Sequence, residues 1–128
     1  MKKLFLLSIL FIFACSSDSD SDNRPTNGNS FNPPNWIQGV WKEQPADYFS
    51  YEFRADDICN ILGNQASCFK AIIELYEDVP NVQTNIYEEI SNTRYYVVFS
   101  YLTVENTYEF EKISENEISN GQFIYTKQ

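Results

Sequence analysis

The sequence predicts an all-β domain, either a small antiparallel meander barrel or a sandwich of seven to eight strands. From residue 36 onward, short segments of alternating apolar and polar residues are separated by polar turn residues, which is typical of half-buried strands. Of the 21 aromatic residues, 18 lie from Phe31 onward, and strands favour aromatic and β-branched side chains. A meander of short strands favours a barrel or sandwich because both forms remove or shorten exposed sheet edges.

The first 34 residues differ in composition from the rest. Lys2 and Lys3 precede an apolar run at residues 4–14, which is too short to span a membrane because a spanning helix needs roughly 20 apolar residues. This pattern is typical of a cleaved signal peptide. The stretch that follows is rich in Ser, Asp and Asn and holds too little apolar surface to fold. We therefore expect a signal peptide (1–14), a flexible tether (15–34) and one β domain (35–128).

The first half of the expected domain contains four candidate strands, at residues 36–42, 48–54, 58–62 and 69–76. In the second of these, Phe49, Tyr51 and Phe53 alternate with polar residues and are expected to face the core. The fourth segment could also be helical, but its β-branched and aromatic residues favour a strand. No convincing helix is expected in the domain.

The second half is expected to continue the meander through segments 82–90, 94–102 and 107–111, a short return at Ile118, and segment 123–126. Segment 94–102 is apolar at nearly every position, which indicates a central strand covered on both faces. Asn120-Gly121 is the strongest hairpin signal in the chain, because this dipeptide suits the two-residue turn that joins antiparallel strands.

Composition argues against several function classes. Acidic residues outnumber basic ones by 18 to 9, for a net charge of −9, so nucleic acid and anionic lipid surfaces are not expected partners. The chain has no histidine, which excludes histidine-based catalytic triads and histidine metal ligands. Carboxylate pairs such as Asp56-Asp57 and Glu88-Glu89 could serve a glycosidase, but we interpret them as solvated surface charge. No catalytic residue, metal or cofactor is therefore expected.

A lipidation motif lies at the end of the apolar run. Ile12-Phe13-Ala14-Cys15 resembles the bacterial lipobox, although Phe13 departs from the smaller residue usual at that position. The resemblance to bacterial lipoproteins implies a diacylglyceryl thioether and an N-acyl chain on Cys15, and stable anchoring needs more than one chain. Ser16, directly after the cysteine, favours the outer membrane. The alternative is plain secretion with a free Cys15.

The tract that follows Cys15 also bears on location. Residues 16–22 consist of Ser and Asp only, and they resemble the acidic export tract of surface lipoproteins of the Bacteroidetes type. That resemblance implies display on the outer face of the cell. The alternative is a solvated spacer that carries no information on localisation.

Cys59 and Cys68 are expected to form a disulfide, since the cell envelope is oxidising. Two free thiols are the alternative, and a zinc site is not expected because zinc takes four nitrogen or sulfur ligands. The disulfide would cross-link the two strands of a hairpin on either side of turn 63–65. On the chain-entropy model, it would stabilise the domain by roughly 2–3 kcal/mol.

Gly39-Val40-Trp41, near the start of the domain, resembles the first-strand G-x-W signature of the lipocalins and of lipocalin-like bacterial lipoproteins. The resemblance implies a barrel with one end closed by Trp41, which would pack on a basic residue of the last strand. Lys127 is the candidate for that residue, although the family more often uses Arg. An ordinary first strand with a buried Trp is the alternative.

The aromatic residues suggest a binding cavity. Tyr51, Phe53, Tyr95 and Phe99 could line a pocket that is open at one end and holds a small apolar, aromatic or sugar ligand. The alternative is that these rings form the core and its rim.

We therefore expect a non-catalytic, lipid-anchored envelope protein that binds a small ligand. The main alternative is a protein–protein module, such as an inhibitor, an immunity protein or an accessory subunit of an envelope complex; an envelope hydrolase has little support. A cavity lined by the four candidate rings would favour the ligand. A filled interior with an exposed apolar and acidic patch would favour a protein partner.

Overall fold

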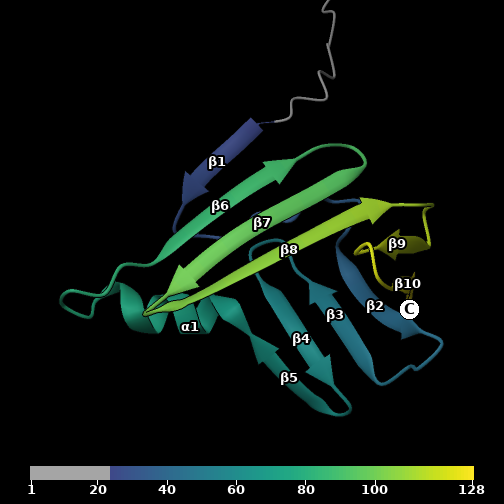
Figure 1. The fold of residues 1–128 in the computed structure, drawn as a ribbon, viewed down its shortest axis with the longest axis horizontal. Coiled ribbons are helices and arrows are strands. Elements are labelled where there is room, and N and C mark those ends of the chain that lie inside the picture. Colours follow the sequence, from purple (N-terminus) through teal and green to yellow (C-terminus); the bar gives the residue numbers. More distant parts are fainter. Residues whose placement is uncertain (1–23) are drawn as a thin grey trace, which may run out of the picture.

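The structure is a computed structural model that describes residues 24–128. These residues form a single antiparallel sheet of ten strands, together with one short helix. The sheet curls into a half-barrel (Figure 1). The expected all-β antiparallel fold is confirmed, with ten strands instead of seven or eight.

In chain order, the elements are β1 (Arg24–Gly28), β2 (Gly39–Gln44), β3 (Phe49–Phe53), β4 (Ile58–Leu62), β5 (Gln65–Cys68), α1 (Phe69–Glu77), β6 (Asn85–Ile90), β7 (Arg94–Tyr101), β8 (Val104–Lys112), β9 (Glu117–Ser119) and β10 (Ile124–Lys127). Strands β6, β7 and β8 form one layer of the curled sheet, and they cross over the layer that holds β3, β4 and β5 (Figure 1). The core lies between these two layers.

The order of strands in the sheet is β1-β6-β7-β8-β9-β10-β2-β3-β4-β5. Most neighbours are consecutive in the chain, as a meander requires, because short turns join antiparallel strands. The pairing of β10 with β2 is an exception: it sets Trp41 opposite Lys127 and brings the last strand beside the second. β1 and β5 are left as the two edges of the sheet.

Aromatic rings fill the space between the layers. Trp41, Phe53, Tyr95, Phe99 and Phe110 are all fully buried. The rings of Phe53 and Phe110 meet edge to face, with 5.1 Å between their centroids. Such a pair contributes about 0.5–1.5 kcal/mol beyond the apolar area that it buries.

Strand β7 is covered on one face only. Tyr95, Val97 and Phe99 are buried, whereas Tyr96 and Val98, which alternate with them, are half-buried. The expectation of a strand covered on both faces is therefore wrong. No second layer lies over the outer face within residues 24–128, and the apolar residues on it remain partly exposed.

Segment 69–76, expected to be a strand, lies within helix α1. Phe69 and Ile73 are buried one turn apart, and Ile72 packs against the same core. The backbone N–H of Lys70 in the first turn donates to the carboxylate of Asp57, at 2.8 Å. A partner outside the helix thus satisfies one of the first-turn N–H groups that a helix leaves unpaired.

The folded part begins earlier than the expected boundary at residue 35. β1 pairs with β6, and Phe31 is buried with its ring edge to face against Phe99, 5.1 Å between centroids. Residues 24–34 are therefore not a free tether, because the edge of β6 supplies backbone partners that the segment lacks on its own. The rest of the expected tether (15–23) and the expected signal peptide (1–14) lie outside the described residues.

Candidate functional site

The four candidate ligand-lining residues belong to the core. Phe53, Tyr95 and Phe99 are fully buried, and Tyr51 is 7% exposed. Tyr51 stacks on Phe53 at 5.9 Å between centroids, and Phe53 meets Tyr95 edge to face at 6.1 Å. Within residues 24–128, none of the pockets that the structure describes is lined by any of these four rings.

The structure brings Gly39, Trp41 and Lys127 together. The Lys127 ammonium lies 5.1 Å from the centre of the Trp41 ring, within the range of a cation–π contact, and the indole N–H donates to the Ile37 carbonyl at 2.6 Å. Gly39 has φ of +124°, and a Cβ there would meet Lys127 Cε at 3.0 Å. The backbone conformation therefore favours glycine here, and a side chain at this position would also push the Lys127 stem aside.

The disulfide between Cys59 and Cys68 is present, as expected. The two residues are opposite one another on β4 and β5, and Cys68 directly precedes α1. Asp57, two residues before Cys59, is buried and accepts N–H groups from Ile58 and Lys70. The disulfide and this carboxylate together fix the start of the helix against β4.

A second buried carboxyl group, Glu88, holds the N-terminal segment. Glu88 is 2% exposed; its Oε1 accepts the Tyr95 hydroxyl at 2.5 Å and the Asn32 backbone N–H at 2.9 Å. Burial raises the pKa of the Glu88 carboxyl above its ordinary value, and these hydrogen bonds only partly oppose that effect. Glu88 faces Thr26 of β1 in the strand register, so the group links β6, β7 and the segment that follows β1.

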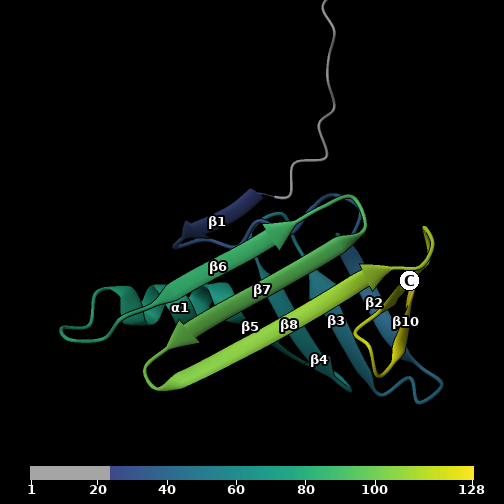
Figure 2. The same ribbon diagram turned by 45° about the horizontal axis from the view of Figure 1, so that its top comes forward.

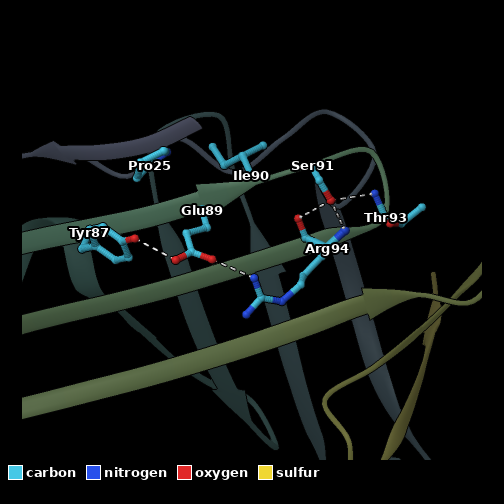
Figure 3. Close-up of a pocket in the computed structure, with 7 residues that line it drawn as sticks. All are labelled: Pro25, Tyr87, Glu89, Ile90, Ser91, Thr93 and Arg94. Atoms are coloured by element: carbon cyan, nitrogen blue, oxygen red, sulfur yellow. Dashed lines mark hydrogen bonds and ion pairs between the residues drawn. The ribbon is translucent and has the colours of Figure 1, made fainter. Parts of the chain in front are cut away.

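A polar network lies on the outer face at the β6–β7 turn (Figure 3). The Tyr87 hydroxyl donates to one oxygen of Glu89 at 2.7 Å, and Arg94 Nη1 donates to the other at 2.8 Å. Arg94 Nε reaches Glu109 on β8 at 2.6 Å, and the guanidinium lies 5.0 Å from the centre of the Tyr96 ring. The hydroxyl and the guanidinium hold the pKa of the Glu89 carboxyl below its usual range.

A pocket of about 400 Å³ lies over this network, lined by Pro25, Tyr87, Glu89, Ile90, Ser91, Thr93 and Arg94. The turn beneath it is well braced. Ser91 Oγ accepts the backbone N–H groups of Thr93 and Arg94, and the Trp36 indole donates to the Ser91 carbonyl at 2.8 Å. The pocket therefore has fixed hydrogen-bonding groups on one side and the apolar side chain of Pro25 nearby, whereas the Ile90 side chain packs against the core.

The opposite end of the β6–β8 layer carries exposed apolar side chains. Here the β7–β8 turn lies beside α1 (Figures 1 and 2), and the Tyr76 and Tyr101 rings stack at 5.9 Å with 7° between their planes. Leu75 and Leu102 are 67% and 50% exposed. We name this surface the apolar end; it comprises Leu75, Tyr76, Val79, Tyr101, Leu102 and Val104.

Acidic residues accompany the apolar end. The exposed carboxylates close to it in the chain are Glu74, Glu77, Asp78 and Glu105. From Ala71 to Thr93 the sequence has no basic residue. Exposed apolar side chains grouped at one end of a protein, with polar residues around them, are typical of a site that binds another protein.

Neither the apolar end nor the polar network at the β6–β7 turn was predicted from the sequence. The apolar end depends on the helix, which was expected to be a strand, and on the stacking of two tyrosines that are 25 positions apart. The outer network joins Glu89, Arg94 and Glu109 across three strands. An available signal was the spacing of Tyr87 and Glu89, which places both side chains on the same face of one strand.

We found no protein-family model, no curated protein and no solved structure that matches this chain. Among the described residues, no helix is long and apolar enough to cross a membrane.

Proposed function

We propose that the protein is a non-catalytic module of the cell envelope that binds another protein through the apolar end. The observation that carries this proposal is an exposed apolar and acidic surface combined with a core that aromatic rings fill. A ligand inside the half-barrel has less support, because it would have to displace buried rings such as Phe53 and Tyr95 from one another.

The chemistry of the apolar end selects the kind of partner. Interfaces commonly have an apolar and aromatic centre with a polar rim, and the stacked Tyr76 and Tyr101 rings with Leu102 fit such a centre. The neighbouring carboxylates favour a partner whose own apolar anchor is surrounded by Lys and Arg. Association with such a partner would be steered electrostatically and would weaken as salt rises.

We also propose that the module is tethered to the outer membrane by acyl chains on Cys15, with display on the cell surface. The support is the lipobox-like motif at residues 12–15 and the Ser/Asp tract at residues 16–22. Mass spectrometry of the mature N-terminus tests the anchor. A Cys15 that carries a diacylglyceryl group and an N-acyl chain is expected, and an unmodified Cys15 would overturn this part of the proposal.

A photo-crosslinking residue at position 102 tests the docking surface in the native envelope. The variant Leu102→p-benzoylphenylalanine is expected to capture one discrete protein with a basic surface, and capture is expected to fall as salt is added. Position 62 provides a matched control, because Leu62 is 50% exposed like Leu102 but lies at the end of β4. Equal capture of the same proteins from both positions would contradict the proposal.

A further inference from the structure

We propose that the pocket at the β6–β7 turn binds a neutral saccharide, through the network of Tyr87, Glu89 and Arg94. This site lies on the outer face at the opposite end of the β6–β8 layer from the apolar end (Figures 1 and 3). The proposal is independent of the protein-binding function and of the interior cavity that the aromatic residues suggested.

The size and composition of the pocket suit a sugar. Its volume of about 400 Å³ falls in the usual range for small-molecule sites, roughly 300–1,000 Å³. Polar groups line most of it, and Pro25, which lies opposite Glu89 on β1, supplies apolar surface for the C–H face of a pyranose ring. A sugar needs both, because its hydroxyl groups point outward around a ring whose faces are apolar.

The network offers hydrogen-bonding groups that remain available. Among the side chains that the structure describes, from Pro25 onward, no partner is seen for Arg94 Nη2 or for the Thr93 hydroxyl. Each Glu89 oxygen accepts one hydrogen bond, from Tyr87 or from Arg94, and each can accept a second. Two adjacent hydroxyls of one ring could therefore donate to Glu89 and accept from Arg94, and hydrogen bonds to charged groups are the stronger kind.

The charge balance selects a neutral ligand. Arg94 already contacts two carboxylates, Glu89 and Glu109, so the local charge is negative and an anionic ligand would be repelled. A cationic ligand would compete with Arg94 for the same oxygens. A polyol displaces neither ion pair and adds hydrogen bonds to both partners.

The site is also held in place before a ligand arrives. Arg94 is fixed by both glutamates and lies against the Tyr96 ring, and the turn backbone is bonded to Ser91 Oγ. Side chains that are already ordered lose little freedom on binding, which helps a shallow site to bind at all.

NMR titration of the full chain tests the proposal. The probes are glucose, galactose, mannose, N-acetylglucosamine, maltose and cellobiose, with cyclohexanol and acetate as comparison solutes. At least one sugar is expected to shift the amide signals of Ser91, Thr93 and Arg94, and the Arg94 Nε–H signal, in a saturable way. Cyclohexanol and acetate are expected to leave them unchanged.

Variants separate the site from nonspecific effects. Glu89→Gln removes the charge that holds Arg94 and is expected to weaken sugar binding at least tenfold; Tyr87→Phe is expected to weaken it less, since it removes one hydrogen bond to Glu89. Glu105→Gln, on the same outer face farther along β8, is the matched control and is expected to bind as the parent does. Thermal melts verify that each variant folds.

Three outcomes would overturn the inference. The first is that none of the six sugars shifts these signals. The second is that Glu89→Gln and Glu105→Gln bind a sugar equally well. The third is that acetate shifts the signals at lower concentration than any sugar. None of these outcomes bears on crosslinking from the apolar end, so the two proposals fail separately.

Discussion

At the scale of single residues, the carboxylate of Asp57 supports the start of the helix from outside it. Replacing it by alanine leaves the N–H groups of Ile58 and Lys70 without their partner. We expect Asp57→Ala to lower the free energy of unfolding by about 1–2 kcal/mol, as the loss of a helix cap does. Chemical denaturation measures this change. Asp56→Ala is the control, because Asp56 is exposed and its carboxylate pairs with the Lys70 ammonium, not with a first-turn N–H group. An equal loss in both variants would contradict the capping role.

Glu88 makes stability depend on pH in the direction opposite to that of a salt-bridged carboxylate. Its pKa is raised on folding, so its contribution to stability is full below its ordinary value near 4.5 and is lost as pH rises through the folded pKa. Glu88→Gln keeps an oxygen that can accept from Tyr95 and Asn32 but cannot ionise. We therefore expect Glu88→Gln to gain stability relative to the parent as pH rises from 4 to 8.

The same residue provides a second comparison. Glu88→Ala removes the acceptor and leaves the buried Tyr95 hydroxyl unpaired, which costs about 1–3 kcal/mol relative to Glu88→Gln at every pH, because neither variant ionises at this position. Denaturation curves at several pH values distinguish the two variants. A Glu88→Gln variant whose stability tracks the parent at each pH would rule out the burial effect.

At the scale of elements, the disulfide joins β4 to β5 and holds the chain just before α1. The double variant Cys59→Ala/Cys68→Ala removes a cross-link between two residues that are nine positions apart in the chain. We expect it to lose about 2–3 kcal/mol of stability on the chain-entropy model. Denaturation with and without a reductant measures the loss. A reductant should destabilise the parent and leave the double variant unaffected, and a reductant effect on both would contradict the assignment.

The elements also show which features of the fold local sequence could predict. Alternation located β3 and β10, because a period of two is visible in the chain where one face of a strand meets the core. β7 was located by its run of apolar residues, and β4 as a short apolar segment between two turns. The class of α1 was missed even though Phe69, Ile72, Ile73 and Tyr76 have helical spacing. The β-branched and aromatic residues of this segment favoured a strand in the prediction and outweighed its helical spacing. The carboxylate of Asp57 that stabilises the helix lies 13 residues before Lys70, so the local sequence gives no sign of it.

The start of the folded part was missed for a different reason. Residues Arg24–Gly28 have no apolar pattern of their own, and they become a strand only because the edge of β6 is available to them. Local composition does not reveal long-range pairing of this kind. The candidate site was equally hidden, since its charges come together from three neighbouring strands across the sheet.

At the scale of the whole molecule, acidic charge is expected to oppose self-association through the apolar end. The chain carries a net charge of −9, and its isoelectric point is about 4.3. Near that pH the mutual repulsion disappears, and exposed apolar surface is then free to associate. We expect light scattering to detect self-association near pH 4.3 that is absent at pH 7.

Leu102→Ser tests where that association occurs. This variant is expected to reduce the scattering near the isoelectric point, because it removes an exposed side chain from the apolar end. Leu62→Ser, at a position of equal exposure outside that surface, is expected to scatter like the parent. An equal reduction in both would show that the apolar end has no special part in association.

The pairing of β2 with β10 has a consequence for how the chain acquires its structure. Trp41 has Lys127 as its strand partner, and all the strands from β3 to β9 lie between them in the chain. A polypeptide that is exported from its N-terminus therefore carries β2 across long before the segment that must sit beside it. If the chain is exported as we propose, the pairing of β2 with β10 cannot form while the last strand is still to cross. It must wait until β10 has emerged, and joining two such distant segments is a slow step of the kind that exposes a nascent chain to chaperones and proteases.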